Sequence, residues 1–465
     1  MQRLPAESLG CIFVACLPDE PYVRPARDRA PLLLVEVCRR WREVARQTPQ
    51  LWRSLDAIQD HGWGELGVVN WEDMDNFETW LSRSGNRPLS LGLSFSDDAN
   101  FRDDWMELVQ SYRERFWRLR IVDGDRVDLN QLLDGAHMLQ HLAVQALFEE
   151  GDRVVAVTQP LPRLKTLVLD LLHASPGTLR DAGWANLTRL AVRLPEVVSY
   201  EVEKFLILLD RCPNLDRLIF GPVAAGSHHP SSRSHPNLRM LAVILHSGDE
   251  DPVFNLILPN LEFLKVLYDF DGELEESLMS DEKLAPFPLY DLADSSEQET
   301  PSAVGPPGPL RSIRVVGGGQ CFAMFDLCWA NVEELDVHYS GGGVLSMALA
   351  ACPNLRVLSL RGACEANSAG FFTPFTHPTL ASLSITARAE LGNFFSMATL
   401  PSLRELKVIA TSYGQHDDVR TFLTRSGCSL ETLWVWARGS AVWTEGEQEE
   451  LMELIPTLTR LVLNA

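Results

Sequence analysis

The sequence predicts an α/β protein in which a small N-terminal three-helix module is followed by a solenoid with one long, curved parallel sheet. Three observations lead to this fold class. A short apolar pattern recurs along most of the 465 residues, the first 56 residues show helical spacing instead, and the composition is 46% hydrophobic and 22% charged. That composition is ordinary for a folded chain, so most of the sequence is expected to bury a core.

The recurring pattern is an apolar residue, two others, Leu, one other, and a second apolar residue, as in Leu164, Leu167 and Leu169. Its middle residue falls at Leu119, Leu142, Leu167, Leu190, Leu218, Leu241, Leu264, Ile313, Leu335, Leu358, Leu383, Leu406, Leu433 and Leu461. Twelve of the thirteen intervals between these positions are 22 to 28 residues long. That is the period of a leucine-rich repeat, in which each unit supplies one strand and a return segment. Stacked units form a curved surface, so residues 87–465 are expected to bind a partner.

Two or three small helices are predicted before the repeats. In residues 4–17, Leu9, Ile12, Phe13 and Cys16 follow at helical spacing after Pro5, which suits a first helical turn. A polar, Pro- and Arg-rich loop spans residues 18–31, and a second amphipathic helix is predicted from about residue 32 to residue 47. A module this small buries too little surface to be expected to fold alone, so it should dock on the next domain or on a partner.

The N-terminal module, residues 1–56, resembles an F-box. The resemblance rests on Leu4-Pro5, Glu7 and Ile12-Phe13, on VCRRWR from Val37 to Arg42, and on TPQLWRSL from Thr48 to Leu55. With WLSRSGNRPLSL (Trp80 to Leu91) and the repeats, the whole chain looks like the fungal F-box-like proteins that carry degenerate leucine-rich repeats. The loop at residues 18–31 is longer than in the commonest F-boxes.

This resemblance implies the substrate-recognition subunit of a Skp–cullin–F-box type ubiquitin ligase. The module would bind the Skp adaptor, and through it a cullin–RING ligase, while the repeats hold a target near the ubiquitin-charged enzyme. The residues that the resemblance assigns to adaptor binding are Leu4, Pro5, Leu9, Ile12, Phe13, Val37 and Trp41. Two alternatives stay open. In the first, the module serves only as a cap that shields the first repeat; in the second, the chain is a repeat scaffold unconnected with ubiquitination.

Residues 57–86 are expected to link the module to the solenoid. A helix is predicted over residues 73–84 with Gly85 as its C-terminal cap, and the alternation in residues 89–93 predicts the first strand. The long interval after Leu264 predicts an insert at about residues 270–309. Eleven carboxylates and one lysine between Asp269 and Glu299 give this stretch a charge of −10, and its Ser- and Pro-rich composition cannot support a packed core.

The formal net charge of −22 argues against nucleic acid or an anionic membrane as the partner of the whole molecule. Nine cysteines without a CxxC pair suit a reducing compartment. The apolar segment from Leu9 to Leu17 lacks the cleavage site of a secretory signal, and no run is long enough to span a membrane. The cytoplasm or the nucleus is therefore the expected location.

No enzymatic activity, metal site or cofactor is expected, because the motifs that such chemistry requires are missing from the sequence. Gly317-Gly318-Gly319 precedes Cys321, but no motif places a histidine beside this thiol. His228, His229 and His235 lack the spacing of a zinc site. An enzyme built on the repeat loops is the most distant alternative.

Residues that alternate with the buried markers should point to the concave face of the sheet. Of 42 such positions, ten are basic and four are acidic, whereas the whole chain has 41 basic and 63 acidic residues. An acidic or phosphorylated target is therefore expected, because Arg pairs well with carboxylate and phosphate. The candidate target-binding residues are Arg189, Arg193, Arg217, Arg314, Arg361, Trp434 and Trp436. The alternative is that these charges only solvate an exposed sheet.

Overall fold

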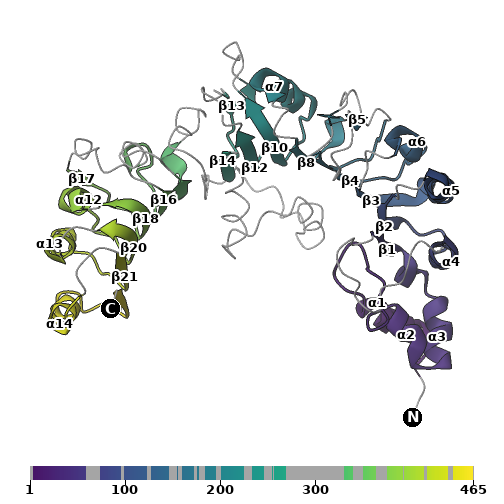
Figure 1. Cartoon of the computed structure of the whole chain (residues 1–465), viewed down its shortest axis with the longest axis horizontal. Coiled ribbons are helices and arrows are strands. Elements are labelled where there is room, and N and C mark those ends of the chain that lie inside the picture. The colour runs from purple at the N-terminus through teal and green to yellow at the C-terminus, as the bar shows by residue number, and fades with distance from the viewer. Residues whose placement is uncertain are drawn as a thin grey trace.

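Two parallel sheets form the inner side of an arch, and helices cover its outer side (Figure 1). The computed structural model describes residues 4–58, 74–95, 99–122, 127–145, 154–155, 160–171, 175–176, 184–194, 200–224, 233–245, 254, 256–268, 329–338, 349–362, 374–390, 392–412, 416–437 and 443–463. The predicted α/β class and the long parallel sheet are confirmed. The predicted insert at residues 270–309 and the candidate Arg314 lie outside the described residues.

The first sheet runs through nine strands in chain order: β1 (Ser54–Ala57), β2 (Leu89–Ser94), β3 (Phe116–Val122), β4 (His141–Gln145), β6 (Thr166–Asp170), β8 (Arg189–Arg193), β10 (Arg217–Ala224), β12 (Met240–Leu245) and β14 (Phe263–Tyr268). A short tenth strand, β9 (Tyr200–Glu201), pairs with the end of β10. The second sheet contains β15 (Glu334–His338), β16 (Val357–Gly362), β18 (Ser382–Glu390), β20 (Glu405–Ser412), β21 (Thr432–Ala437) and β22 (Arg460–Leu463).

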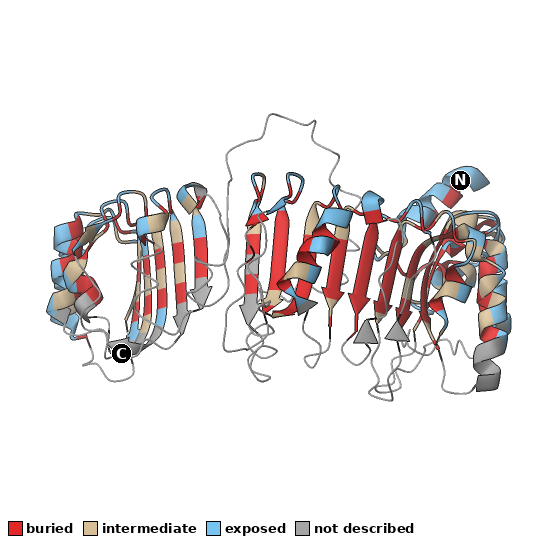
Figure 2. Cartoon of the chain, turned by 90° about the horizontal axis from the view of Figure 1, so that it is seen from above, coloured by how far each residue is buried: buried red, intermediate tan, exposed pale blue. Residues whose placement is uncertain are grey.

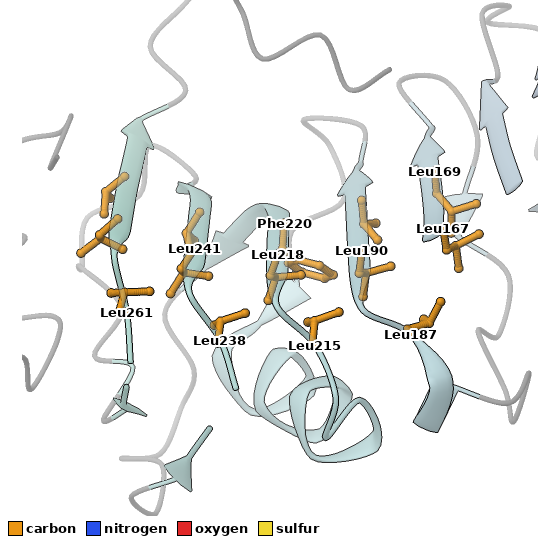
Figure 3. Packing of buried hydrophobic residues seen from close by; sticks show 14 of the residues in the cluster. Leu167, Leu169, Leu187, Leu190, Leu215, Leu218, Phe220, Leu238, Leu241 and Leu261 are labelled. Carbon is orange, nitrogen blue, oxygen red and sulfur yellow. The ribbon is translucent and has the colours of Figure 1, made fainter. Parts of the chain in front are cut away.

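The predicted markers stack on one another because the strands pair in register. Leu142 pairs with Leu167, Leu167 with Leu190, and Leu190 with Leu218. Figure 3 shows Leu167, Leu190, Leu218 and Leu241 in a row across neighbouring strands, with Leu187, Leu215 and Leu238 in the turns that precede three of them. Every predicted marker within the described residues lies in a strand. Burial of each leucine contributes roughly 1.5–3 kcal/mol to the free energy of unfolding. The stacked leucines are therefore a main source of the stability of the solenoid.

The return segments carry helices that pack on the back of the sheets. These are α5 (Ala99–Gln110), α6 (Leu129–Leu133), η4 (Trp184–Asn186), α7 (Val202–Arg211), η5 (Trp329–Asn331), α12 (Gly392–Met397), α13 (His416–Ser426) and α14 (Glu445–Leu454). Small two-stranded pairs join neighbouring return segments: β5 (Val154–Val155) with β7 (Ser175–Pro176), β11 (Arg233–Ser234) with β13 (Leu256–Ile257), and β17 (Phe375–Thr376) with β19 (Ala398–Thr399). In α7, Phe205 is fully buried with its ring 5.2 Å from that of Phe220 in β10.

Asparagine side chains join several successive units at the turn before the strand. The Nδ2 of Asn214 donates to the carbonyl of Ala185 at 2.7 Å, that of Asn237 to Pro213 at 2.9 Å, and that of Asn260 to Pro236 at 2.7 Å. Each bond satisfies a backbone carbonyl that the turn leaves without a partner in the sheet. The asparagine before the first leucine of a unit therefore fixes the spacing between neighbours.

The N-terminal module consists of α1 (Ala6–Ala15), α2 (Leu32–Val37), α3 (Arg39–Arg46) and the short helix η1 (Pro49–Trp52). The single helix predicted over residues 32–47 is therefore two helices. The backbone of Cys38 is extended, with φ −160° and ψ 169°, and its thiol accepts a hydrogen bond from the N–H of Trp41 at 3.5 Å. Cys38 thus caps α3, and apolar spacing continues across the break because both helices face the same core.

The loop between α1 and α2 covers the free edge of β1. The N–H of Asp56 donates to the carbonyl of Val23 at 2.8 Å, and the N–H of Val23 donates to the hydroxyl of Ser54 at 3.0 Å. Tyr22 and Val23 are buried there. Covering the edge removes an open template for pairing with another strand. The predicted linker helix is α4 (Met74–Arg83), and the expected capping residue Gly85 has a left-handed φ of 57°.

Arg120 of β3 ties the module to the concave face of the first strands. Its guanidinium pairs with the carboxylate of Asp56 in β1 at 2.9 Å and lies 5.1 Å from the ring centre of Tyr22. Gly92 of β2 lies between Asp56 and Arg120, and a Cβ at this position would sit 2.4 Å from Oδ1 of Asp56. A side chain at residue 92 would therefore displace the Asp56 carboxylate from the position in which it pairs with Arg120.

Candidate functional site

The first candidate surface is a group of exposed apolar side chains on the N-terminal module. Leu4 is 52% exposed, Ile12 of α1 45%, and Leu33 and Val37 of α2 43% and 53%. Exposed apolar side chains concentrated on one small module are typical of a protein-interaction surface, because their burial against a partner is favourable. Of the seven residues predicted to bind an adaptor, Leu4, Pro5, Ile12 and Val37 are exposed.

The other three predicted residues lie behind this surface. Leu9 and Phe13 are buried in the core of the module, and the half-buried ring of Trp41 lies 4.9 Å from that of Phe13. Leu33 was not among the predicted residues. It precedes Val37 by four positions on α2, so the helical spacing of the two residues could have identified it as part of the same face.

Helix α3 of the module also carries arginines, among them Arg39, Arg40 and Arg42. The guanidinium of Arg40 donates to the carbonyl of Leu4, which fastens the start of the chain to α3. Arg42 donates from Nε to the carbonyl of Val35 at 2.8 Å, and Arg39 pairs with Glu43 at 3.1 Å on the solvent side. The module thus carries arginines as well as exposed apolar side chains, and both are common in protein interfaces.

The concave face of the first sheet is largely buried. Its central row, in register from β4 to β12, contains Ala143, Val168, Ala191, Ile219 and Ala242, each less than a tenth exposed. Figure 2 shows the strands of this sheet buried along almost their whole length, whereas those of the second sheet alternate between buried and more exposed residues. The first sheet therefore offers a partner far less accessible surface than alternation alone predicts.

The candidate arginines of the first sheet flank this row. Arg189 and Arg193 of β8 and Arg217 of β10 are half-buried, and Arg217 pairs with Asp216 at 3.4 Å. Arg189 and Arg217 are in register on adjacent strands, whereas Arg193 is in register with the buried Asp170. The structure thus places Arg189 and Arg217 side by side, whereas Arg193 lies on the other side of the central row. Arg361 is the penultimate residue of β16 in the other sheet.

His141 of β4 lies in the same row as Arg189, two strands away. Burial, together with the charges of Arg118, Arg189 and Lys165, lowers the pKa of His141 to about 3. The ring is 7% exposed and meets Trp117 edge-on at 5.9 Å. His141 is therefore neutral at physiological pH and is part of the packed face.

We expect His141 to make the first sheet sensitive to acid. Its folded pKa lies below the unfolded value near 6.5, so its stabilising effect is present above pH 6.5 and is lost as pH falls toward 3. Between pH 6.5 and pH 4.5, the loss amounts to about 2 kcal/mol of unfolding free energy. His141→Gln should flatten this dependence in urea titrations at several pH values. An unchanged slope would contradict the assignment, and His137→Gln, at an exposed position, is the control.

The second candidate surface lies on the concave face of β20, β21 and β22. It consists of Lys407, Ile409, Trp434, Trp436, Arg460 and Val462, which we call the tryptophan patch. The ammonium of Lys407 lies 5.0 Å and the guanidinium of Arg460 5.9 Å from the ring centre of Trp434. Trp436 is 41% exposed. Strand alternation predicted both tryptophans and both cations on this face, but the contacts of Lys407 and Arg460 with Trp434 follow only from the register of three strands.

The buried thiols and imidazoles of the repeats have structural roles. His235 and His377 each bond through Nε2 to the carbonyl of a cysteine in the preceding unit, Cys212 at 2.9 Å and Cys352 at 3.0 Å. Burial raises the pKa of each of these thiols to about 12, which leaves them without the thiolate that nucleophilic chemistry requires. Within the described ranges, no three metal-ligating side chains come together. A membrane span would need a longer and more apolar helix than any in the described part of the chain.

The sequence matches no protein-family model and no curated protein sequence. Solved structures that overlap with the fold include an internalin from Listeria monocytogenes, 13% identical with a TM-score of 0.36 over 77% of this chain and 82% of the internalin. A leucine-rich-repeat protein of Leptospira interrogans is 12% identical with a TM-score of 0.37 over 90% of this chain and 97% of its own. TM-scores and sequence identities this low carry no argument about function. The assignment as a leucine-rich-repeat solenoid rests on the repeat period and strand register of this chain.

Proposed function

We propose that this protein is the substrate-recognition subunit of a Skp–cullin–F-box type ubiquitin ligase. The N-terminal module would dock on the Skp adaptor, and the solenoid would hold a target protein. The protein itself makes no bond; it supplies proximity and orientation between the target and the ubiquitin-charged enzyme.

The observation that carries this proposal is the exposure of Ile12 and Val37 directly beside a well-packed module core. Phe13, next to Ile12 in α1, is fully buried against Trp41, so the module has a folded core and still presents apolar side chains to solvent. A module that served only the solenoid would be expected to turn such side chains inward. Docking on a second protein explains why they point outward.

A second candidate function is a repeat scaffold in which the module is only an N-terminal cap. The loop at residues 21–23 favours this alternative, because it covers the edge of β1 as a cap would. The two functions are not exclusive in structure, since capping uses the loop and η1, whereas docking uses α1 and α2.

Copurification separates these candidates. The full chain, mixed with purified Skp adaptor and cullin, should elute from a size-exclusion column as one complex containing all three proteins. Separate elution at micromolar concentrations would exclude the ligase role and leave the scaffold.

A further inference from the structure

The tryptophan patch differs from the rest of the concave face in which it lies. In the row that contains Trp434, the strands before Lys407 carry Ser384 and Ser359, which are in register with one another. The concave face therefore changes from small serine side chains on β16 and β18 to large aromatic side chains on β21. Among the exposed large apolar side chains of the described residues, Trp436 is the one aromatic.

The patch is organised by strand register. Lys407, Trp434 and Val462 lie side by side on β20, β21 and β22, and Ile409 lies beside Trp436. Ile409, Trp434 and Val462 are half-buried, and Arg460 is exposed. Three strands span about 10 Å, and the two tryptophans are about 7 Å apart along β21. A surface of this size fits three or four extended residues, which is a short segment and not a folded domain.

The two cations of the patch, Lys407 and Arg460, favour an acidic partner segment. Lys407 and Arg460 lie against the faces of Trp434 from the two neighbouring strands, so they are already ordered and lose little freedom when they pair with a ligand. The nearest acid of the adjoining row, Glu405, accepts a hydrogen bond from Ser382 at 2.9 Å, on the side away from β22. The cations beside Trp434 are therefore placed to meet a carboxylate, and they would repel a basic segment.

We propose that the tryptophan patch holds a short segment of a partner protein in which an apolar side chain stands next to a carboxylate. The apolar side chain packs on Trp436, Ile409 and Val462, and the carboxylate pairs with Lys407 or with Arg460, which lie on either side of Trp434. This inference rests on the proposed function, since it identifies the surface through which the solenoid holds its target. In this proposal the main contact with the target is made by the tryptophan patch and not by the arginines of the first sheet, which lie beside a buried row of side chains.

Three synthetic peptides of equal length test the proposal by calorimetry with the full chain. The first alternates Asp with Leu, the second has Lys in place of Asp, and the third has Ser in place of Leu. The first should bind, and the other two should bind at least about tenfold more weakly, because each lacks one of the two contacts. Equal binding of the Lys peptide or of the Ser peptide would overturn the proposal.

Variants locate the site. Trp436→Ser and the pair Lys407→Glu with Arg460→Glu should each weaken binding of the Asp–Leu peptide about tenfold or more. The matched control is Arg189→Glu with Arg193→Glu on the first sheet, which should leave binding unchanged. The opposite pattern would place the segment on the first sheet and overturn the proposal. Circular dichroism confirms that each variant is folded.

Adaptor binding, measured on the same samples, keeps the two proposals apart. Trp436→Ser should still elute with the Skp adaptor. If the peptide binds the patch but neither the wild type nor any variant binds the adaptor, the ligase role is excluded and the proposal for the patch is supported. If the adaptor binds but no peptide does, the patch proposal fails and the ligase role stands.

Discussion

Replacing Ile12 and Val37 together by Glu is expected to abolish adaptor binding and to leave the melting temperature of the chain nearly unchanged. Both side chains are about half exposed, so charge is tolerated in the free protein. In a complex, each contributes roughly 1.5–3 kcal/mol of apolar burial, and an uncompensated carboxylate in their place adds a desolvation cost. The combined effect exceeds about 100-fold in affinity. Titration of the variant against the Skp adaptor measures it.

Ile207→Glu provides the matched control for this prediction. Ile207 of α7 is 49% exposed on the outer side of the solenoid, away from the module. Its replacement should change neither adaptor affinity nor stability by much. If the Ile12 and Val37 variant binds the adaptor like wild type, the exposed apolar group is not the docking surface. Equal weakening by Ile207→Glu would instead indicate a general effect of added negative charge on an acidic protein.

Trp52→Ala is expected to cause the largest loss of stability, about 3–5 kcal/mol. Trp52 is fully buried where the module meets the solenoid. Its indole N–H donates to the carbonyl of Ala45 at 2.9 Å, its ring meets that of Trp80 edge-on at 4.8 Å, and the guanidinium of Arg83 lies 4.6 Å from it. Removing the indole leaves a cavity between α3 and α4 and an unpaired carbonyl at Ala45. Chemical unfolding followed by circular dichroism measures the change.

Trp436→Ala removes an equally large side chain from an exposed position and should cost less than about 1 kcal/mol. Trp52→Phe keeps the ring contact with Trp80 and loses the hydrogen bond, so it should cost an intermediate amount, about 1–2 kcal/mol. In a solenoid the loss should stay local, with faster amide exchange in α1 to α4 and β1 and little change near β22. A Trp52→Ala variant as stable as Trp436→Ala would show that the module is not anchored through this indole.

The strands could be predicted because one simple rule places them. A leucine every 22 to 28 residues becomes buried only when the strands stack on one another. Leu167, Leu190 and Leu218 stack in this way, in register. The break at Cys38 was not predictable from spacing, since apolar residues continue on one face through both helices. The contact between Tyr22 and Arg120 joins distant segments whose meeting depends on the docking of the whole loop.

For the candidate sites, alternation correctly placed Trp434 and Trp436 on one face of β21, but it carried no information on how open that face is. The small side chains Ala143 and Ala191 sit deep between longer neighbours, so the first sheet is buried where charge counting predicted an accessible surface. The pairing of Lys407 with Trp434 requires the register between strands from different units, which is a property of the stacked array. Local sequence determines which residues face outward, and packing determines which of them a partner can reach.

The central claim is that the N-terminal module contacts a second protein while the solenoid remains free to hold a target. Hydrogen–deuterium exchange on the full chain, with and without the Skp adaptor, tests it most directly. The proposed function predicts slower exchange in α1, α2 and α3 on adding the adaptor, and no change in β20, β21 or β22. Unchanged exchange in α1 to α3, or protection confined to the strands of the solenoid, would contradict it.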